Sequence, residues 1–134
     1  MTEARVEKVY ADRLGARTHL AQAEKFQADA DAQDLSTESR SVLLHNAAIS
    51  ASNAILQAAG LRVTSGDRSH LRRLETALAQ LDHDTGDLLE RLDASRSRRN
   101  EASYASMLVA QASVDEAREA TAELIELTRD YLRE

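Results

Sequence analysis

The chain has 134 residues, 30% of them charged, and a formal net charge of −6 at pH 7. It contains no cysteine and no proline, which excludes disulfides and thiolate metal sites and leaves few residues that would interrupt a helix. Aromatic residues make up only 3% of the chain, too few to pack a sheet. We therefore predict one all-α domain over residues 1–134. The acidic balance argues against a general nucleic-acid coat.

The charge pattern along the chain also bears on its location. The first ten residues, MTEARVEKVY, mix charges of both signs and lack the apolar stretch of a secretory signal. An uncharged stretch, residues 41–61, carries too many polar groups for a bilayer span, among them His45, Asn46 and Asn53. We expect a cytoplasmic protein with no membrane contact.

The first half of the chain predicts two long helices. Apolar residues at helical spacing predict a first helix over residues 3–31, with Gly15 as a candidate interruption. The second helix is expected to begin at Ser36 or Thr37, which can cap its first turn, and to end before Gly60, which suits a left-handed stop.

Two stripes share the second helix. The first contains small and aliphatic residues that would allow close packing, namely Leu44, Ala47, Ala48, Ala51, Ala54, Ile55 and Ala58. The second is polar and uncharged, namely Asn46, Ser50, Asn53 and Gln57. The polar stripe must be hydrogen-bonded if it is buried, or else it faces a partner or a wet cleft.

Three further helices are predicted in the second half. A third is expected over about 67–80 and, after the turn DHDTGD, a fourth over about 84–104. The fifth is expected to begin at Ser113, whose partner Glu116 would complete a capping box. No strand is expected. The predicted architecture is an up-and-down antiparallel bundle of four to five helices.

Positive charge is concentrated in two segments. Residues 62–73 hold four arginines against Asp67, and residues 91–100 hold four arginines against Asp93. Such clusters can form a local anion site. They can equally be solvated helix faces whose arginines pair with the acidic helices.

The fourth helix carries its apolar stripe into the second arginine cluster. The stripe runs from Leu88 through Leu92 and Ser95 to Arg99. Seven residues make nearly two turns, so Arg99 should point inward like Leu92, whereas Arg98 falls on the solvent face. An inward guanidinium needs a partner, which could be a carboxylate, the backbone of a dimer mate or a ligand phosphate.

Two polar residues adjoin Arg99 near the end of this helix. Asn100 and Tyr104 are four residues apart and so share a helix face. Together with Arg99 they would offer a planar cation, an amide and a phenol. This combination suits phosphate and base contacts, and it equally suits a structural network that joins helices.

The four histidines are the remaining groups with site chemistry. His45 is interpreted as a hydrogen-bonded core residue in preference to a catalytic one, and His19 and His83 as surface residues. His70 is the candidate for a role near phosphate. No histidine pair has metal-ligand spacing with carboxylates, so we expect neither a metal nor a cofactor. The candidate nucleic-acid ligands are Arg98, Arg99, His70, Arg72 and Arg73.

The stretch RNEASY, with Arg99 and Asn100 at its first two places, resembles the motif of the HEPN superfamily. These small helical bundles carry an arginine, commonly a following polar residue, and a histidine four to six positions on. The order of helical segments over residues 35–133 is similar as well. The resemblance implies a dimer cleft in which the arginine and histidine of two protomers cleave RNA without a metal. Here Tyr104 stands where histidine is expected, and tyrosine is a poor base at neutral pH.

Two functions follow as expectations. The first is a HEPN-like RNA- or nucleotide-associated module, such as the ribonuclease-toxin-like component of a toxin–antitoxin or defence system, with Arg99, Asn100 and Tyr104 as its site. If it is active, it would be a metal-independent endoribonuclease, and Tyr104 leaves the activity open. The alternative is a non-catalytic homodimeric bundle that acts in protein–protein interaction. A homodimer is expected in both cases, and the resemblance implies RNA and an antitoxin or nucleotidyltransferase-type protein as partners.

Overall fold

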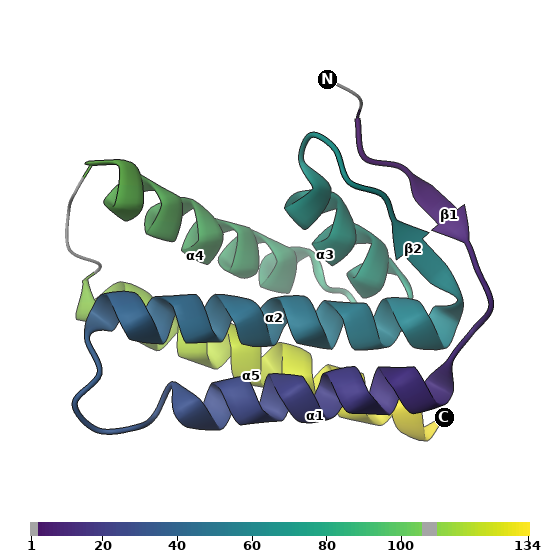
Figure 1. The fold of residues 1–134 in the computed structure, drawn as a ribbon, viewed down its shortest axis with the longest axis horizontal. Helices are drawn as coiled ribbons and strands as arrows, with labels where there is room; N and C mark the ends of the chain where they lie inside the picture. The colour runs from purple at the N-terminus through teal and green to yellow at the C-terminus, as the bar shows by residue number, and fades with distance from the viewer. Residues whose placement is uncertain (1–2, 106–109) are drawn as a thin grey trace.

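The computed structural model describes residues 3–105 and 110–134, and for residues 98–105 it describes the helical backbone only. Five helices are found within these residues, which confirms the predicted all-α bundle (Figure 1). They are α1 (Arg13–Asp29), α2 (Thr37–Ala59), α3 (Ser69–Ala79), α4 (Gly86–Ala105) and α5 (Gln111–Arg133). The third and fourth helices therefore lie within two residues of their predicted bounds.

Helix α2 is the centre of the bundle. It contacts each of the other four helices, with α1 and α5 along one side and α3 and α4 along the other (Figure 1). All seven residues of its predicted apolar stripe are buried, as expected. The stripe is mostly alanine, so neighbouring helices approach α2 closely.

The predicted ends of α2 are confirmed. The Ser36 hydroxyl accepts a hydrogen bond from the Ser39 backbone N–H at 3.0 Å and so caps the first turn. Gly60 ends the helix in the left-handed conformation, with φ at 74°. This residue reverses the chain direction and leads into the next segment.

A small antiparallel strand pair corrects the prediction that residues 3–31 form one helix and that the chain has no strand. Strand β1 (Val6–Lys8) pairs with β2 (Leu61–Val63), which follows Gly60. Valines at positions 6 and 9 fit helical spacing, but β-branched residues also favour strands, and the partner strand lies more than fifty residues away. Helix α1 begins only at Arg13, and Gly15 lies inside its first turn without interrupting it.

The predicted capping box of the fifth helix is wrong. Helix α5 begins at Gln111, two residues before Ser113, and its N-cap residue Ala110 has no side-chain capping hydrogen bond. Ala117, Ala120 and Leu124 recur at helical spacing along this helix and are buried, whereas Leu127 and Tyr131 farther along are half-buried.

Hydroxyl groups are buried without disturbing the core. Ser52 and Thr128 are fully buried, and each donates a hydrogen bond to the backbone carbonyl four residues earlier, at 2.9 and 2.7 Å. These bonds satisfy the hydroxyls within their own helices.

In the described part of the chain, helices that combine the length and hydropathy needed to cross a membrane are absent.

The left-handed stop at Gly60 generates a stability prediction. A Cβ at this position would lie 2.8 Å from the Val9 carbonyl oxygen. We expect Gly60→Ala to lower the free energy of unfolding in urea by about 2 kcal/mol, because of the positive φ and the clash with residues 3–12, which we call the N-terminal arm. Gly86→Ala is the matched control. Its Cβ would meet only Asp84 Oδ1 at 3.6 Å, so the change should be within about 0.5 kcal/mol. Equal losses in both variants would contradict the assignment.

Candidate functional site

The site predicted at the end of the fourth helix is only partly described. The backbones of Arg98, Arg99, Asn100 and Tyr104 belong to α4, but their side chains lie outside the described residues. The stripe that leads to them is confirmed as far as it can be followed. Leu88 and Leu92 are buried and Ser95 is half-buried.

Three of the six arginines of the basic segments whose side chains the structure describes form ion pairs, as the structural interpretation predicts. Arg62 pairs with Glu7 across the two strands. Arg91 joins α4 to α5 through Glu123 and also contacts Asp87 at 2.9 Å. Arg96 contacts Asp93 of the same helix at 3.2 Å. The clusters are therefore partly neutralised.

The electrostatics of Arg91 mark it as a structural residue. The pKa of Arg91 is raised above its ordinary value, chiefly because the guanidinium donates a hydrogen bond to Glu123. Burial acts in the opposite direction, and Asp87 adds a smaller favourable contribution. The Arg91 side chain therefore links α4 to α5.

The other three described arginines of these segments are different. Within residues 3–105 and 110–134, Arg68, Arg72 and Arg73 have no ion-pair partner. Arg68 precedes α3, and Arg72 and Arg73 lie in its first turns. Positive charge that is not neutralised within the described fold is thus gathered at the start of one short helix.

A polar cleft lies at this end of α3, and we call it the α3–α4 cleft. It has a volume of about 420 Å³. The turn before α3 and its first residues form one wall, and α4 contributes Asp93 and Arg96. Because Asp67 also lines the cleft, both signs of charge are present.

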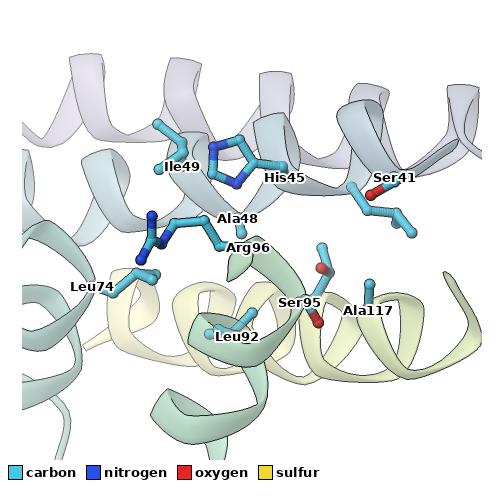
Figure 2. Close-up of a pocket in the computed structure, with 11 residues that line it drawn as sticks. Ser41, His45, Ala48, Ile49, Leu74, Leu92, Ser95, Arg96 and Ala117 are labelled. Atoms are coloured by element: carbon cyan, nitrogen blue, oxygen red, sulfur yellow. The ribbon is translucent and has the colours of Figure 1, made fainter. Parts of the chain in front are cut away.

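Arg96 connects this cleft to the bundle interior. Figure 2 shows its side chain reaching from α4 between Ile49 of α2 and Leu74 of α3. The same side chain lines a small internal cavity of about 20 Å³, which is too small for an organic ligand. It is 26% exposed, so its stem packs inside while its charged end reaches the cleft.

Two histidines that are 25 residues apart in sequence meet beside Arg96. The rings of His45 on α2 and His70 on α3 are 5.6 Å apart, edge to face. His45 lines the internal cavity, and His70 lines the α3–α4 cleft. This pairing could not be predicted from the sequence, because neither spacing nor helical periodicity relates the two positions.

The other two histidines, His83 and His19, differ in their exposure to solvent. His83 is exposed, as expected. The prediction that His19 is a surface residue is wrong, because the ring is half-buried and its Nδ1 atom is buried without a hydrogen-bond partner in the described structure. The error arises because α1 packs along α2, which turns this position toward the N-terminal arm.

The grouping of Arg96, His70 and Arg68 suits an anion. Guanidinium groups donate paired hydrogen bonds to phosphate or carboxylate, and imidazole can donate or accept a proton near neutral pH. Groups of three or more histidines and carboxylates that could hold a metal ion are absent from the described residues.

Comparisons with protein-family models, curated proteins and solved structures found no match to this chain. The resemblance to HEPN proteins therefore stays a prediction that rests on the residue pattern.

Because the Arg96–Asp93 ion pair is partly exposed, we expect its removal to have only a small effect on the free energy of unfolding. Asp93 is 36% exposed, so its carboxylate can hydrate when the guanidinium is removed. We expect Arg96→Met, which keeps the packed stem, to change the free energy of unfolding by at most about 1 kcal/mol. Leu92→Ala, one turn earlier and buried, should lose about 2–5 kcal/mol in the same urea titration. A loss of about 3 kcal/mol or more in Arg96→Met would instead identify a buried structural ion pair.

Proposed function

We propose that this chain is an RNA-associated helical bundle of the HEPN type, in which the α3–α4 cleft holds phosphates of the RNA backbone. The observation that carries the proposal is the convergence of Arg68, His70 and Arg96 on one polar cleft. These residues come from a turn and two helices. A chain with a net charge of −6 thus brings two guanidinium groups and an imidazole together in one cleft, beside the carboxylates of Asp67 and Asp93.

The backbone at the start of α3 supports an anion at this place. Arg68 occupies the N-cap position with φ at 62°, a left-handed conformation that is uncommon outside glycine. The helix start has no side-chain capping hydrogen bond. The Ser69 N–H donates to the Gly66 carbonyl, so it is the following N–H groups of the first turn that can donate to a bound phosphate, and the helix dipole favours negative charge there.

The residues of the HEPN-like motif extend the proposed site along α4. Arg99 follows Arg96 by three residues, and Asn100 and Tyr104 come within the next turns. Under the proposal, Arg99 and Asn100 bind the RNA backbone or a base. Tyr104 donates a hydrogen bond in place of the proton transfer that a histidine would supply. A homodimer, a toxin–antitoxin or defence setting, and an antitoxin or nucleotidyltransferase-type partner belong to the same proposal and rest on the resemblance.

Phosphate binding in the α3–α4 cleft predicts weak, salt-dependent affinity for RNA. We expect a fluorescein-labelled single-stranded RNA to bind with a log–log salt slope of about −1.4, since two guanidinium groups, those of Arg68 and Arg96, would contact phosphates. Arg96→Met and Arg68→Ala should each weaken binding at least tenfold in an anisotropy titration. Arg129→Ala is the matched control. It also removes an ion-paired arginine, the partner of Glu24 between α5 and α1, but Arg129 does not line the cleft. Binding that is unchanged in both cleft variants would refute the cleft as the site.

The motif on α4 predicts the outcome of a cleavage assay. End-labelled single-stranded RNA and transfer RNA are incubated with the protein in the presence of a chelator, beside the Arg99→Ala variant. If Tyr104 or another group supports catalysis, cleavage without metal should disappear in the variant. Cleavage that persists in a folded Arg99→Ala protein would remove Arg99 from the site. If neither protein cleaves, the result favours a binding or structural module.

A homodimeric interaction protein is the second candidate, and exposed apolar residues favour it. Tyr10 is 98% exposed and Leu14 75% exposed, and Val6 and Val9 on the same arm are also exposed. Side chains of this kind commonly pack against another chain. Under this alternative the wild-type protein binds no RNA in the titration above, and it purifies without co-eluting nucleic acid.

A further inference from the structure

The outer edge of strand β1 is uncovered in the described fold. Within the described residues the sheet consists of β1 and β2 alone. Figure 1 shows β1 at the margin of the molecule, with β2 on one side and no element along the other. Val6, Lys8 and Val9 are exposed there. An uncovered edge presents backbone donors and acceptors to which a further strand can bind.

The hydrogen bonds to β2 show which residues of β1 face this edge. The Arg5 carbonyl accepts a hydrogen bond from the Thr64 N–H at 2.8 Å, and the Val9 N–H donates to the Gly60 carbonyl at 2.9 Å. Because bonded pairs alternate along an antiparallel ladder, the odd-numbered residues of the segment bond toward β2. The backbone N–H and carbonyl groups of the even-numbered residues of β1 therefore point toward the free edge.

A second copy of the chain can pair with this edge in antiparallel fashion across a two-fold axis. New bonded pairs must join residues that face outward, so the axis can lie at Val6, at Glu7 or at Lys8. An axis at Glu7 would place two carboxylates directly opposite each other, and an axis at Lys8 would do the same with two ammonium groups. Both arrangements are unfavourable. An axis at Val6 brings two valines together instead.

The register centred on Val6 is also complementary in charge. It places Arg5 of each copy opposite Glu7 of the other, in non-hydrogen-bonded pairs, where facing side chains approach most closely. Arg5 is exposed and has no ion-pair partner among the described residues. Glu7 pairs with Arg62 across the two strands, so its carboxylate would lie between two guanidinium groups.

This edge is separate from the motif on α4. In Figure 1, β1 and the C-terminal end of α4 lie at opposite ends of the bundle. The dimer cleft that the HEPN resemblance implies would be formed around Arg99, so the two contacts would not overlap. The inference specifies a contact between two copies and does not rest on RNA binding or on the motif.

We propose that the edge of β1 binds the same edge of a second copy, with Val6 on the two-fold axis and Arg5 opposite Glu7. The two copies then share one four-stranded antiparallel sheet in the order β2–β1–β1–β2. Tyr10 and Leu14, both exposed, follow the strand and add apolar surface for the second copy to cover. Each strand has three residues, so association is weak, with a dissociation constant of about 100 µM.

Self-association is tested by sedimentation equilibrium of the full chain between about 10 µM and about 1 mM. The mass should rise from nearly one to nearly two chains over this range. Arg5→Glu and Glu7→Arg should each abolish the rise, because each places like charges opposite each other. Lys25→Glu is the matched control, since it makes the same charge change as Arg5→Glu at an exposed position on α1. It should associate like the wild type.

Two results of this measurement would overturn the proposal. One is a wild-type mass that does not rise with concentration. The other is undiminished association in either folded variant, with folding checked by circular dichroism. Arg96→Met should associate like the wild type, so failure of RNA binding and failure of this proposal are distinguishable.

Mixing the two variants separates specific pairing from a general effect of charge. In an equimolar mixture of Arg5→Glu and Glu7→Arg, every pair between positions 5 and 7 of unlike chains is again of opposite charge. We expect the mixture to associate although each variant alone does not. A mixture that stays monomeric, beside a wild type that associates, would overturn the register.

Amide hydrogen exchange locates the contact on the strand. The Val6 N–H should exchange about threefold more slowly at the highest concentration than in dilute protein, because it becomes bonded to the second copy. The Val9 N–H already bonds the Gly60 carbonyl and is the internal control, so its exchange should change little. An unchanged Val6 rate in protein that has associated would place the contact elsewhere and overturn the proposal.

Discussion

The close packing of small residues along α2 is the constraint on which the rest of the structure depends. Ala47, Ala51 and Ala54 have no exposed surface, and α1 meets this helix with its own buried alanines, Ala16 and Ala23. Small side chains let helix backbones approach closely, so one central helix can contact four others. Larger residues on this stripe would push α1 and α5 away and open the core.

The two ends of α2 place the features that bear on function. At its C-terminal end, Gly60 turns the chain into β2, and the hydrogen bond from the Val9 N–H to the Gly60 carbonyl, at 2.9 Å, holds the N-terminal arm over the helix. This arm closes one side of a cavity whose lining includes Tyr10, Gln57 and Arg73. Nearer the other end of α2, His45 meets α3 and α4 beside the α3–α4 cleft. One helix thus supports both this cavity and the cleft.

The chain is acidic overall, but its arginines are gathered in local groups that are more positive than the rest of the chain. Arg91 and Arg62 are taken up by ion pairs that fasten α4 to α5 and β1 to β2. The cations around α3 are not used in this way, and Arg68 and Arg73 line separate cavities. The interpretation of the basic segments as ion-paired faces is confirmed for Arg62, Arg91 and Arg96, whereas a local anion site around α3 stays a prediction.

The sequence by itself determined the helical class, the ends of α2 and its buried stripe, because alanine periodicity, Ser36 and Gly60 act within a few residues of chain. It could not determine the strand pair, the meeting of His45 with His70 or the burial of His19, since each joins segments that are distant in sequence. The capping box predicted for α5 is wrong for a related reason, because the packing of the whole helix competes with local capping in deciding where the helix begins. Tertiary structure alone decided which polar residues converge on the α3–α4 cleft.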